Sequence, residues 1–287
     1  MSRNFALLQI VGKEQEYFQP VDVTPAPELV VVPERPLEPK TFPDSAGHDF
    51  AGRESRDHES RDLKSRDQQP LRFEMEEWQL AELTKLVHGV FLAPGSESNR
   101  AISNRIVVLA SSESGNGCSW ICARAGELLA SQVGGQVCLV DANFGRATLH
   151  EHFGVPNHHG LSDALREEGS IGGYVSQLSR RNLALVSAGS DFSADREHRC
   201  LAAAERMSLR LQELRADFDY VLVDGASLDA GDDSIDLGKM TDGIVLVLKT
   251  HSTRKERTRS RVQELKSAGV RILGAVLNQP ASQVDRR

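Results

Sequence analysis

Short apolar runs alternate with amphipathic stretches through most of the chain after residue 100. The runs that are apolar throughout predict strands at 105–110, 136–142, 183–188, 220–225, 242–250 and 271–278. Apolar residues at helical spacing predict helices at 118–132, 199–216 and 254–268, and a short helix with Ser162 as its N-cap. Strands and helices in this alternation indicate an α/β fold with a doubly wound, mostly parallel sheet covered on both faces.

The chain ahead of this pattern divides into three parts. Residues 1–18 carry a weak amphipathic pattern that predicts a short N-terminal helical segment, and residues 19–70, rich in proline and charge, predict a disordered linker. We take residues 71–279 as the domain and 280–287 as a flexible tail. A leading helix at about 73–90 is predicted from apolar side chains at helical spacing: Met75, Trp78, Leu80, Leu83, Leu86, Val87 and Val90.

Composition narrows the class of protein. A net charge of −7 gives no general attraction to nucleic acid, and the basic stretch Arg254 to Arg261 is most simply a solvated helix face. Four cysteines in 287 residues do not make a disulfide framework. No apolar run approaches the roughly 20 residues of a membrane span, and the N-terminus does not look like a signal peptide. We therefore expect a cytoplasmic protein with no nucleic-acid partner.

The stretch "SSESGNGCSW" at 111–120 lies between a predicted strand and a predicted helix, where a phosphate-binding loop would lie. Gly115, Gly117 and Ser119 occupy the places of such a loop's glycines and hydroxyl, whereas Ser112 replaces its first glycine and Cys118 its lysine. A packing turn without a ligand is an alternative reading. A dinucleotide fingerprint, with Asp141 as the ribose-binding acid, is disfavoured because Trp120 stands where the third glycine should be.

A wider series of segments carries a resemblance. "IVVLASSESGNGCSWICARAGELLA", "VCLVDANFGRATLHEHFGVPNHHGLSDAL", "NLALVSAG", "FDYVLVDGASL" and "DGIVLVLKTHSTRKERTRSRVQELKSAGVRILGAVLN" occur in this order. Together, over roughly residues 100–279, they resemble the CpsD/CapB-type bacterial tyrosine autokinases of capsule and exopolysaccharide synthesis. That family lies within the MinD/ParA/Mrp group of P-loop ATPases, so the resemblance implies a P-loop NTPase fold.

The resemblance implies roles for individual residues. Asp141 would assist the metal and the attacking hydroxyl, Asp224 would hold Mg²⁺ through water, and Asn278 would read the adenine edge. Ser119 would place its hydroxyl on Mg²⁺, and the implied cofactor is ATP or ADP with Mg²⁺. Taken alone, each aspartate could equally cap a helix or a turn. The loop implied to bind the nucleotide comprises Ser114, Gly115, Asn116, Gly117, Cys118, Ser119 and Trp120.

Several positions depart from the family pattern. Cys118 cannot supply the charge of the loop lysine, and Glu113 stands where MinD-like loops carry a second lysine. Asn143 stands where the family's Asp-x-Asp pattern has its second acid, and of the basic pair that usually follows this pattern only Arg146 is present. After Asp224, Ala226 and Ser227 stand where the family has prolines. The chain has no C-terminal tyrosine cluster, since its tyrosines are Tyr17, Tyr174 and Tyr220. A tyrosine autokinase is therefore not expected.

Two smaller patterns add expectations. Glu82, Lys85 and His88 are a softened version of the family's ring-forming motif in the leading helix, or simply a solvated face. Cys118 and Cys122 lie one turn apart at a helix start, where we expect a reactive thiolate.

The leading hypothesis is a degenerate nucleotide-binding protein, a pseudoenzyme that regulates or assembles an exopolysaccharide synthesis and export machine. Its partner would be a membrane component for export or chain-length control, which would recruit it to the inner face of the membrane. A homo-oligomer is a further possible arrangement, and the sequence does not give the oligomeric state. One alternative is an active ATPase or kinase that uses another basic residue, such as Arg146. The other is a scaffold that binds no nucleotide because Glu113 and Trp120 block the pocket.

Overall fold

The computed structural model describes residues 5–8, 75, 77–92, 104–189, 201–250 and 255–280. All of them belong to one compact unit, which comprises Met1–Gly12 and Gln68–Arg287. The predicted linker at 19–70 and residues 281–287 of the predicted tail lie outside the described residues. No helix in the described part has the length and apolar character needed to cross a bilayer.

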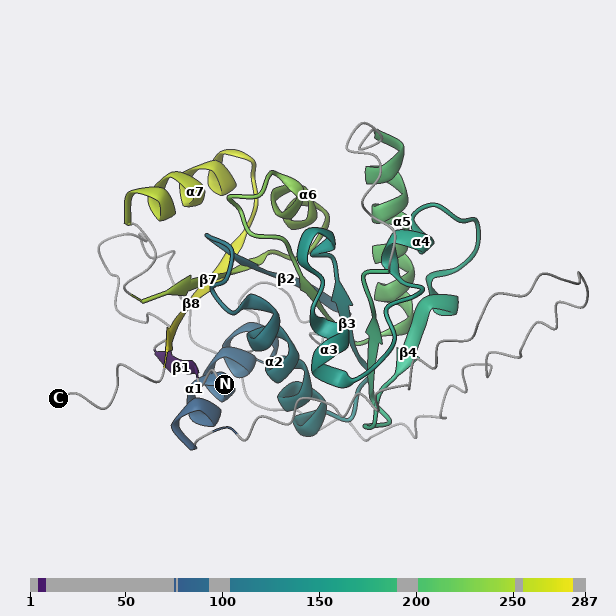
Figure 1. The fold of residues 1–287 in the computed structure, drawn as a ribbon, viewed down its shortest axis with the longest axis horizontal. Coiled ribbons are helices and arrows are strands. Elements are labelled where there is room, and N and C mark those ends of the chain that lie inside the picture. Colours follow the sequence, from purple (N-terminus) through teal and green to yellow (C-terminus); the bar gives the residue numbers. More distant parts are fainter. Residues whose placement is uncertain are drawn as a thin grey trace, which may run out of the picture. The chain divides into compact units, whose positions relative to one another are not determined.

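The domain is built on an eight-stranded sheet with the order β1-β8-β7-β2-β6-β3-β5-β4 (Figure 1). The inner strands are parallel to one another, whereas the edge strands β1 and β4 are antiparallel to their neighbours. The strands are β1 (Phe5–Leu8), β2 (Arg105–Ser111), β3 (Val137–Asp141), β4 (Val175–Gln177), β5 (Leu183–Val186), β6 (Tyr220–Asp224), β7 (Ile244–Lys249) and β8 (Ile272–Pro280). The doubly wound, mostly parallel sheet is thus confirmed.

Helices cover both faces of this sheet, as the fully apolar strands require. The longer ones are α1 (Glu77–Val87), α2 (Cys118–Gln132), α5 (Leu201–Asp217), α6 (Asp233–Met240) and α7 (Lys255–Ser267). Short elements follow the strand ends: η1 (His88–Leu92), η2 (Phe144–Arg146), α3 (Leu149–Phe153), α4 (Leu161–Ala164) and η3 (Ile171–Tyr174). Of the three main predicted helices, α2 is found at the predicted residues, and α5 and α7 have ends shifted by one or two residues, which is the usual uncertainty of helix ends.

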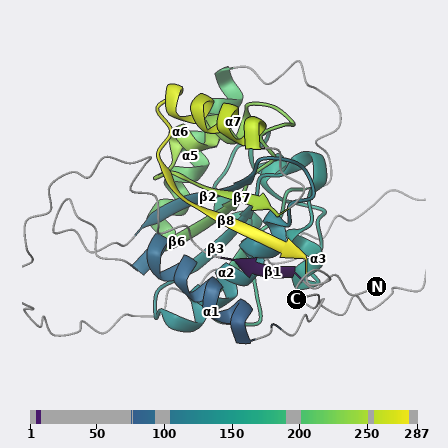
Figure 2. The same cartoon turned by 90° about the vertical axis from the view of Figure 1, so that its left-hand side faces the viewer.

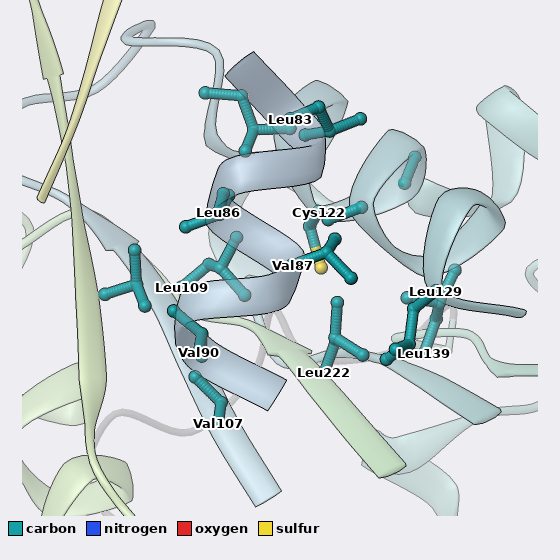
Figure 3. Close-up of a cluster of buried hydrophobic side chains, with 14 of the residues drawn as sticks. Leu83, Leu86, Val87, Val90, Val107, Leu109, Cys122, Leu129, Leu139 and Leu222 are labelled. Atoms are coloured by element: carbon teal, nitrogen blue, oxygen red, sulfur yellow. The ribbon is translucent and has the colours of Figure 1, made fainter. Parts of the chain in front are cut away.

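Alternate residues of each strand point to opposite faces and join two separate apolar clusters. Val107 and Leu109 of β2 belong to the first cluster, with side chains from α1 and α2. Ile106 and Val108 belong to the second cluster, with side chains from α5, α6 and α7. Figure 3 shows side chains of α1 and η1 pointing onto the strands of the first cluster. The leading helix is therefore an integral part of the core.

Two local predictions are wrong. Phe5–Leu8, placed in a helical segment, form β1, which pairs with β8 at the edge of the sheet (Figure 2). Backbone pairing along an open edge outweighs a weak helical pattern in so short a segment. The short helix α4 begins at Leu161 with Gly160, not Ser162, as its N-cap. Gly160 is needed there because a Cβ would lie 2.2 Å from the Ser187 carbonyl oxygen.

Candidate functional site

The loop that connects β2 to α2 has the backbone shape of an anion-binding turn. Gly115 and Gly117 have φ angles of 82° and 85°, a left-handed conformation that side chains disfavour. Gly117 is the N-cap of the 15-residue helix α2, and no side chain caps the helix. A Cβ at Gly115 would meet no atom within 4 Å. The first N–H groups of α2 are consequently available to a negatively charged ligand at the positive end of the helix.

Asn116 and Asn278 hold this loop in place. The buried Asn116 amide donates to Ser112 Oγ at 3.2 Å and to the Val247 carbonyl at 3.4 Å. Asn278 Nδ2, from β8, donates to the Asn116 carbonyl at 2.8 Å. Asn278 is fully buried, and its Oδ1 accepts no hydrogen bond. The residue predicted to read adenine thus supports the loop through its amide nitrogen, and its buried Oδ1 has no hydrogen-bond donor.

Asp141 and Asp224 end neighbouring strands at the same height, since they are register partners of β3 and β6. Both are fully buried. The Asp141 carboxylate accepts hydrogen bonds from the backbone N–H groups of Asn143 (3.1 Å), Thr148 (3.1 Å) and Leu149 (3.0 Å). Burial raises the pKa of Asp141 to about 6, although these N–H groups act in the opposite direction. Asp141 therefore fastens the turn that leads into α3.

Asp224 has a different environment from its neighbour. Burial, and then the negative charge of Asp141, raise the pKa of Asp224 to about 8. The Ser119 hydroxyl and the Cys118 thiol are near enough to lower that pKa in part, but neither Asp224 oxygen accepts a hydrogen bond of good geometry. A buried carboxyl group without donors is costly unless it is protonated or meets a cation. Burial and the charge of Asp141 both favour the protonated form of Asp224.

The two cysteines at the start of α2 are not reactive thiolates, so that expectation is wrong. Cys118 is 7% exposed and Cys122 is fully buried. Burial, and then the negative charge of Asp224, raise the pKa of both thiols well above the ordinary value. Both effects disfavour the thiolate form of the two side chains. A neutral thiol thus occupies the lysine position beside the Asp224 carboxyl group.

The loop residues differ in exposure. Ser114 and Gly115 are exposed, and Gly117 and Ser119 are half-buried. Trp120 is 8% exposed and belongs to the first apolar cluster, so its ring is part of the core. Glu113 lies 3.9 Å from the Arg257 guanidinium of α7. The exposed Arg146 lies on η2.

The other predicted residues lie apart from this loop. Lys85 forms an ion pair with Glu82 at 2.6 Å within α1, and the exposed His88 follows in η1. The Tyr174 hydroxyl donates to Glu167 at 2.8 Å, and Tyr220 belongs to β6. Tyr17 lies outside the described residues.

The residues present fit the phosphate part of a nucleotide, because the uncapped α2 N-terminus and the open Gly115 supply N–H groups. A divalent cation would be held by the Ser119 hydroxyl and Asp224, whose buried oxygens have no donor. Asp141 adds charge nearby, but its oxygens already accept backbone N–H groups. Sequence reasoning missed Arg257 and the loop-holding role of Asn278, since no motif links them to the loop.

The chain is similar in sequence to several bacterial proteins. No protein-family model matches the chain. It is 28% identical over 172 residues to the tyrosine-protein kinase YwqD of Bacillus subtilis, covering 60% of this chain and 71% of that protein. It is 25% identical over 190 residues to the putative tyrosine-protein kinase CapB of Staphylococcus aureus, covering 64% and 82%. Against the succinoglycan biosynthesis transport protein ExoP of Rhizobium meliloti the identity is 28%, and the match spans only 23% of that longer protein.

Solved structures share the fold. The kinase domain of the Escherichia coli tyrosine kinase ETK superposes with a TM-score of 0.60 at 21% identity, covering 73% of this chain and 77% of that chain. A ParA family ATPase from Chlorobium tepidum gives a TM-score of 0.51 at 18% identity, covering 61% and 73%. The predicted MinD/ParA-like P-loop architecture is confirmed, and the chain is related to bacterial tyrosine-protein kinases.

Proposed function

We propose that this chain, a relative of the bacterial tyrosine-protein kinases, is a degenerate nucleotide-binding protein that regulates or assembles an exopolysaccharide synthesis and export machine. The observation that carries the proposal is the contrast within the loop. The left-handed glycines and the uncapped helix are kept, whereas a neutral, buried Cys118 stands beside Asp224 where the lysine is expected. We therefore expect the chain to keep nucleotide binding and to have lost most of its capacity for phosphoryl transfer.

The expected loss of chemistry has an electrostatic reason. Phosphoryl transfer depends mainly on positioning and on neutralising the charge of the transferred group. A missing contact of this kind commonly costs about 10²-fold or more in rate. Asp224, with its raised pKa, is also a poorer partner for a divalent cation at neutral pH, because the proton has to leave first.

Calorimetry of purified protein with Mg-ATP and Mg-ADP, together with an ATP hydrolysis assay, tests the proposal. We expect micromolar binding with turnover close to background. Rapid hydrolysis by the wild type would contradict it, and so would the appearance of phosphotyrosine on incubation with Mg-ATP.

Restoring the lysine sharpens this test. Cys118→Lys places an ammonium beside Asp224, and we expect it to tighten Mg-ATP binding by about tenfold, as one added charge-assisted contact allows. Cys118→Met is the matched control, because it adds length at the same buried position without charge. Equal affinities of the two variants would show that charge at position 118 is not what the loop lacks.

The two alternatives each have one supporting observation. An active ATPase or kinase would need another cation at the loop, and Arg146 is exposed on η2. A scaffold that binds no nucleotide is favoured by Glu113, whose charge at the loop opposes phosphate. Trp120 supports that reading less, because its ring belongs to the core. Thermal stabilisation by ATP would exclude the scaffold.

The relatives guide the proposal on partners. One of them is named as a succinoglycan biosynthesis transport protein. Guided by this relative, we propose that the chain works in the cytoplasm and is recruited to the inner face of the membrane by a membrane component for polysaccharide export or chain-length control. Co-purification of the tagged chain with such a component, encoded by a neighbouring gene, tests this part.

A further inference from the structure

The loop needs a positive charge that its own sequence does not supply. Of the ion pairs within the described part of the chain, the one that reaches the loop joins Glu113 to Arg257 of α7, with 3.9 Å between Oε1 and Nη1. Glu113 Oε1 is buried and accepts no hydrogen bond. The carboxylate therefore holds the guanidinium by charge alone, without the paired hydrogen bonds that would fix it.

The topology brings these two distant residues together. β7 lies next to β2, with Ser111 in register with Val247, and the Ser112 N–H donates to the Val247 carbonyl at 3.3 Å. The chain leaves β7 at the carboxyl end of the sheet and enters α7 at Lys255, so the first turn of α7 faces the loop. Ligands in parallel α/β sheets bind at this edge.

Arg257 is suited to move. Its side chain is 62% exposed, so the guanidinium can turn toward a ligand without disturbing packed side chains. Glu113 is only 19% exposed and its buried oxygen accepts no hydrogen bond, so a phosphate that draws Arg257 away has to compensate for the lost ion pair. A guanidinium also matches the paired oxygens of a phosphate in geometry, which an ammonium does not.

We propose that Arg257 is the cation that replaces the loop lysine: it binds the terminal phosphates of a nucleoside di- or triphosphate, and Glu113 holds it beside the loop until the ligand arrives. This inference rests on the proposed nucleotide binding. It assigns Arg257 to the phosphates and Glu113 to positioning Arg257.

The experiment is calorimetric titration of the full chain with Mg-ADP and Mg-ATP. We expect Arg257→Ala to weaken binding by about tenfold or more, since a charge-assisted contact to phosphate is lost. Arg259→Ala is the matched control: Arg259 is also exposed on α7, and its removal changes the net charge equally. We expect it to stay within about twofold of wild type, because a residue two positions further along a helix projects from the opposite side of the helix and its exposed charge is screened.

A double-variant comparison separates the role of Glu113. Glu113→Gln should tighten binding, because Arg257 no longer has to leave a carboxylate. If Glu113 acts through Arg257, this gain disappears in the Arg257→Ala background. A gain of equal size in both backgrounds would show that Glu113 repels phosphate directly and would overturn its positioning role.

The results of these titrations separate the role of Arg257 from the proposed nucleotide binding on which it rests. A wild type that binds no nucleotide overturns both. Binding that Arg257→Ala leaves unchanged, or that Arg257→Ala and Arg259→Ala weaken equally, overturns the role of Arg257 and leaves nucleotide binding in place.

Discussion

At the scale of single residues, the carboxyl groups of Asp141 and Asp224 show how environment sets chemistry. They have the same side chain, the same sheet edge and the same burial. Asp141 accepts hydrogen bonds from backbone N–H groups, which stabilise its negative charge. Asp224 has no such donors, and the negative charge of Asp141 further disfavours its ionised form. The pKa of Asp224 is consequently raised further, to about 8 against about 6.

This difference predicts a pH-dependent stability. Because the pKa of Asp224 is about 8 in the folded chain and 3.8 as the ordinary value, the folded state keeps a proton that the unfolded state releases between these values. The free energy of unfolding should therefore fall as pH rises from about 4 to about 8, by an amount on the order of a few kcal/mol. Urea denaturation of wild type and Asp224→Asn across this range measures it.

Asp224→Asn removes the titration, so its stability should depend less on pH, and it should exceed wild-type stability at pH 8. Asp229→Asn, at an exposed position, should follow the wild type. Parallel curves for wild type and Asp224→Asn would show that Asp224 is ionised in the folded chain.

At the scale of elements, the buried Arg210 of α5 fastens the segment that runs from α4 to η3. Its guanidinium donates to the carbonyls of Ala164 (2.9 Å), Glu167 (3.1 Å) and Gly169, and it pairs with Glu213 at 2.9 Å. Carbonyls at the end of so short a helix need donors from elsewhere. One side chain from another helix therefore fixes a segment that has little regular structure of its own.

We expect Arg210→Ala to lower the free energy of unfolding by about 3 to 5 kcal/mol, because it leaves buried carbonyl acceptors without a donor and removes the cation that pairs with Glu213. Amide exchange in residues 164–171 should rise more than elsewhere. Arg206→Ala is the control: this exposed arginine donates to the carbonyls of Leu165 and Arg166, so its loss should cost about 1 kcal/mol. If Arg210→Ala and Arg206→Ala lowered the free energy of unfolding equally, Arg210 would not have the proposed role of holding this segment in place.

At the scale of the whole domain, α1 precedes the alternating strands and helices in sequence yet belongs to their core. Leu83 and Val87 are fully buried against the strands and α2 in the first cluster (Figure 3). Leu80, on the same helix, is 41% exposed. The domain therefore depends on α1 for part of its stability.

Leu83→Ala should lower the free energy of unfolding by about 2 to 5 kcal/mol, through lost burial and the cavity left behind. Leu80→Ala should change it by about 0.5 kcal/mol or less, because that side chain is largely in water already. Denaturant unfolding measures both. A similar small effect of the two substitutions would mean that α1 is only loosely attached.

The sequence by itself determined the six parallel strands from β2 to β8, most of the longer helices and the approximate place of the site, whereas the edge strands β1 and β4 and the helix α6 were not predicted. Apolar strands must be covered on both faces, and the ends of parallel strands meet at one edge, so Asp141, Asp224 and the glycine loop were predictably close. Only the tertiary structure decided that Phe5–Leu8 pair with β8, that Asn278 holds the loop, that Cys118 is a neutral thiol and that Arg257 reaches Glu113. These features depend on contacts between residues far apart in the chain and on exclusion of water, which local patterns do not encode.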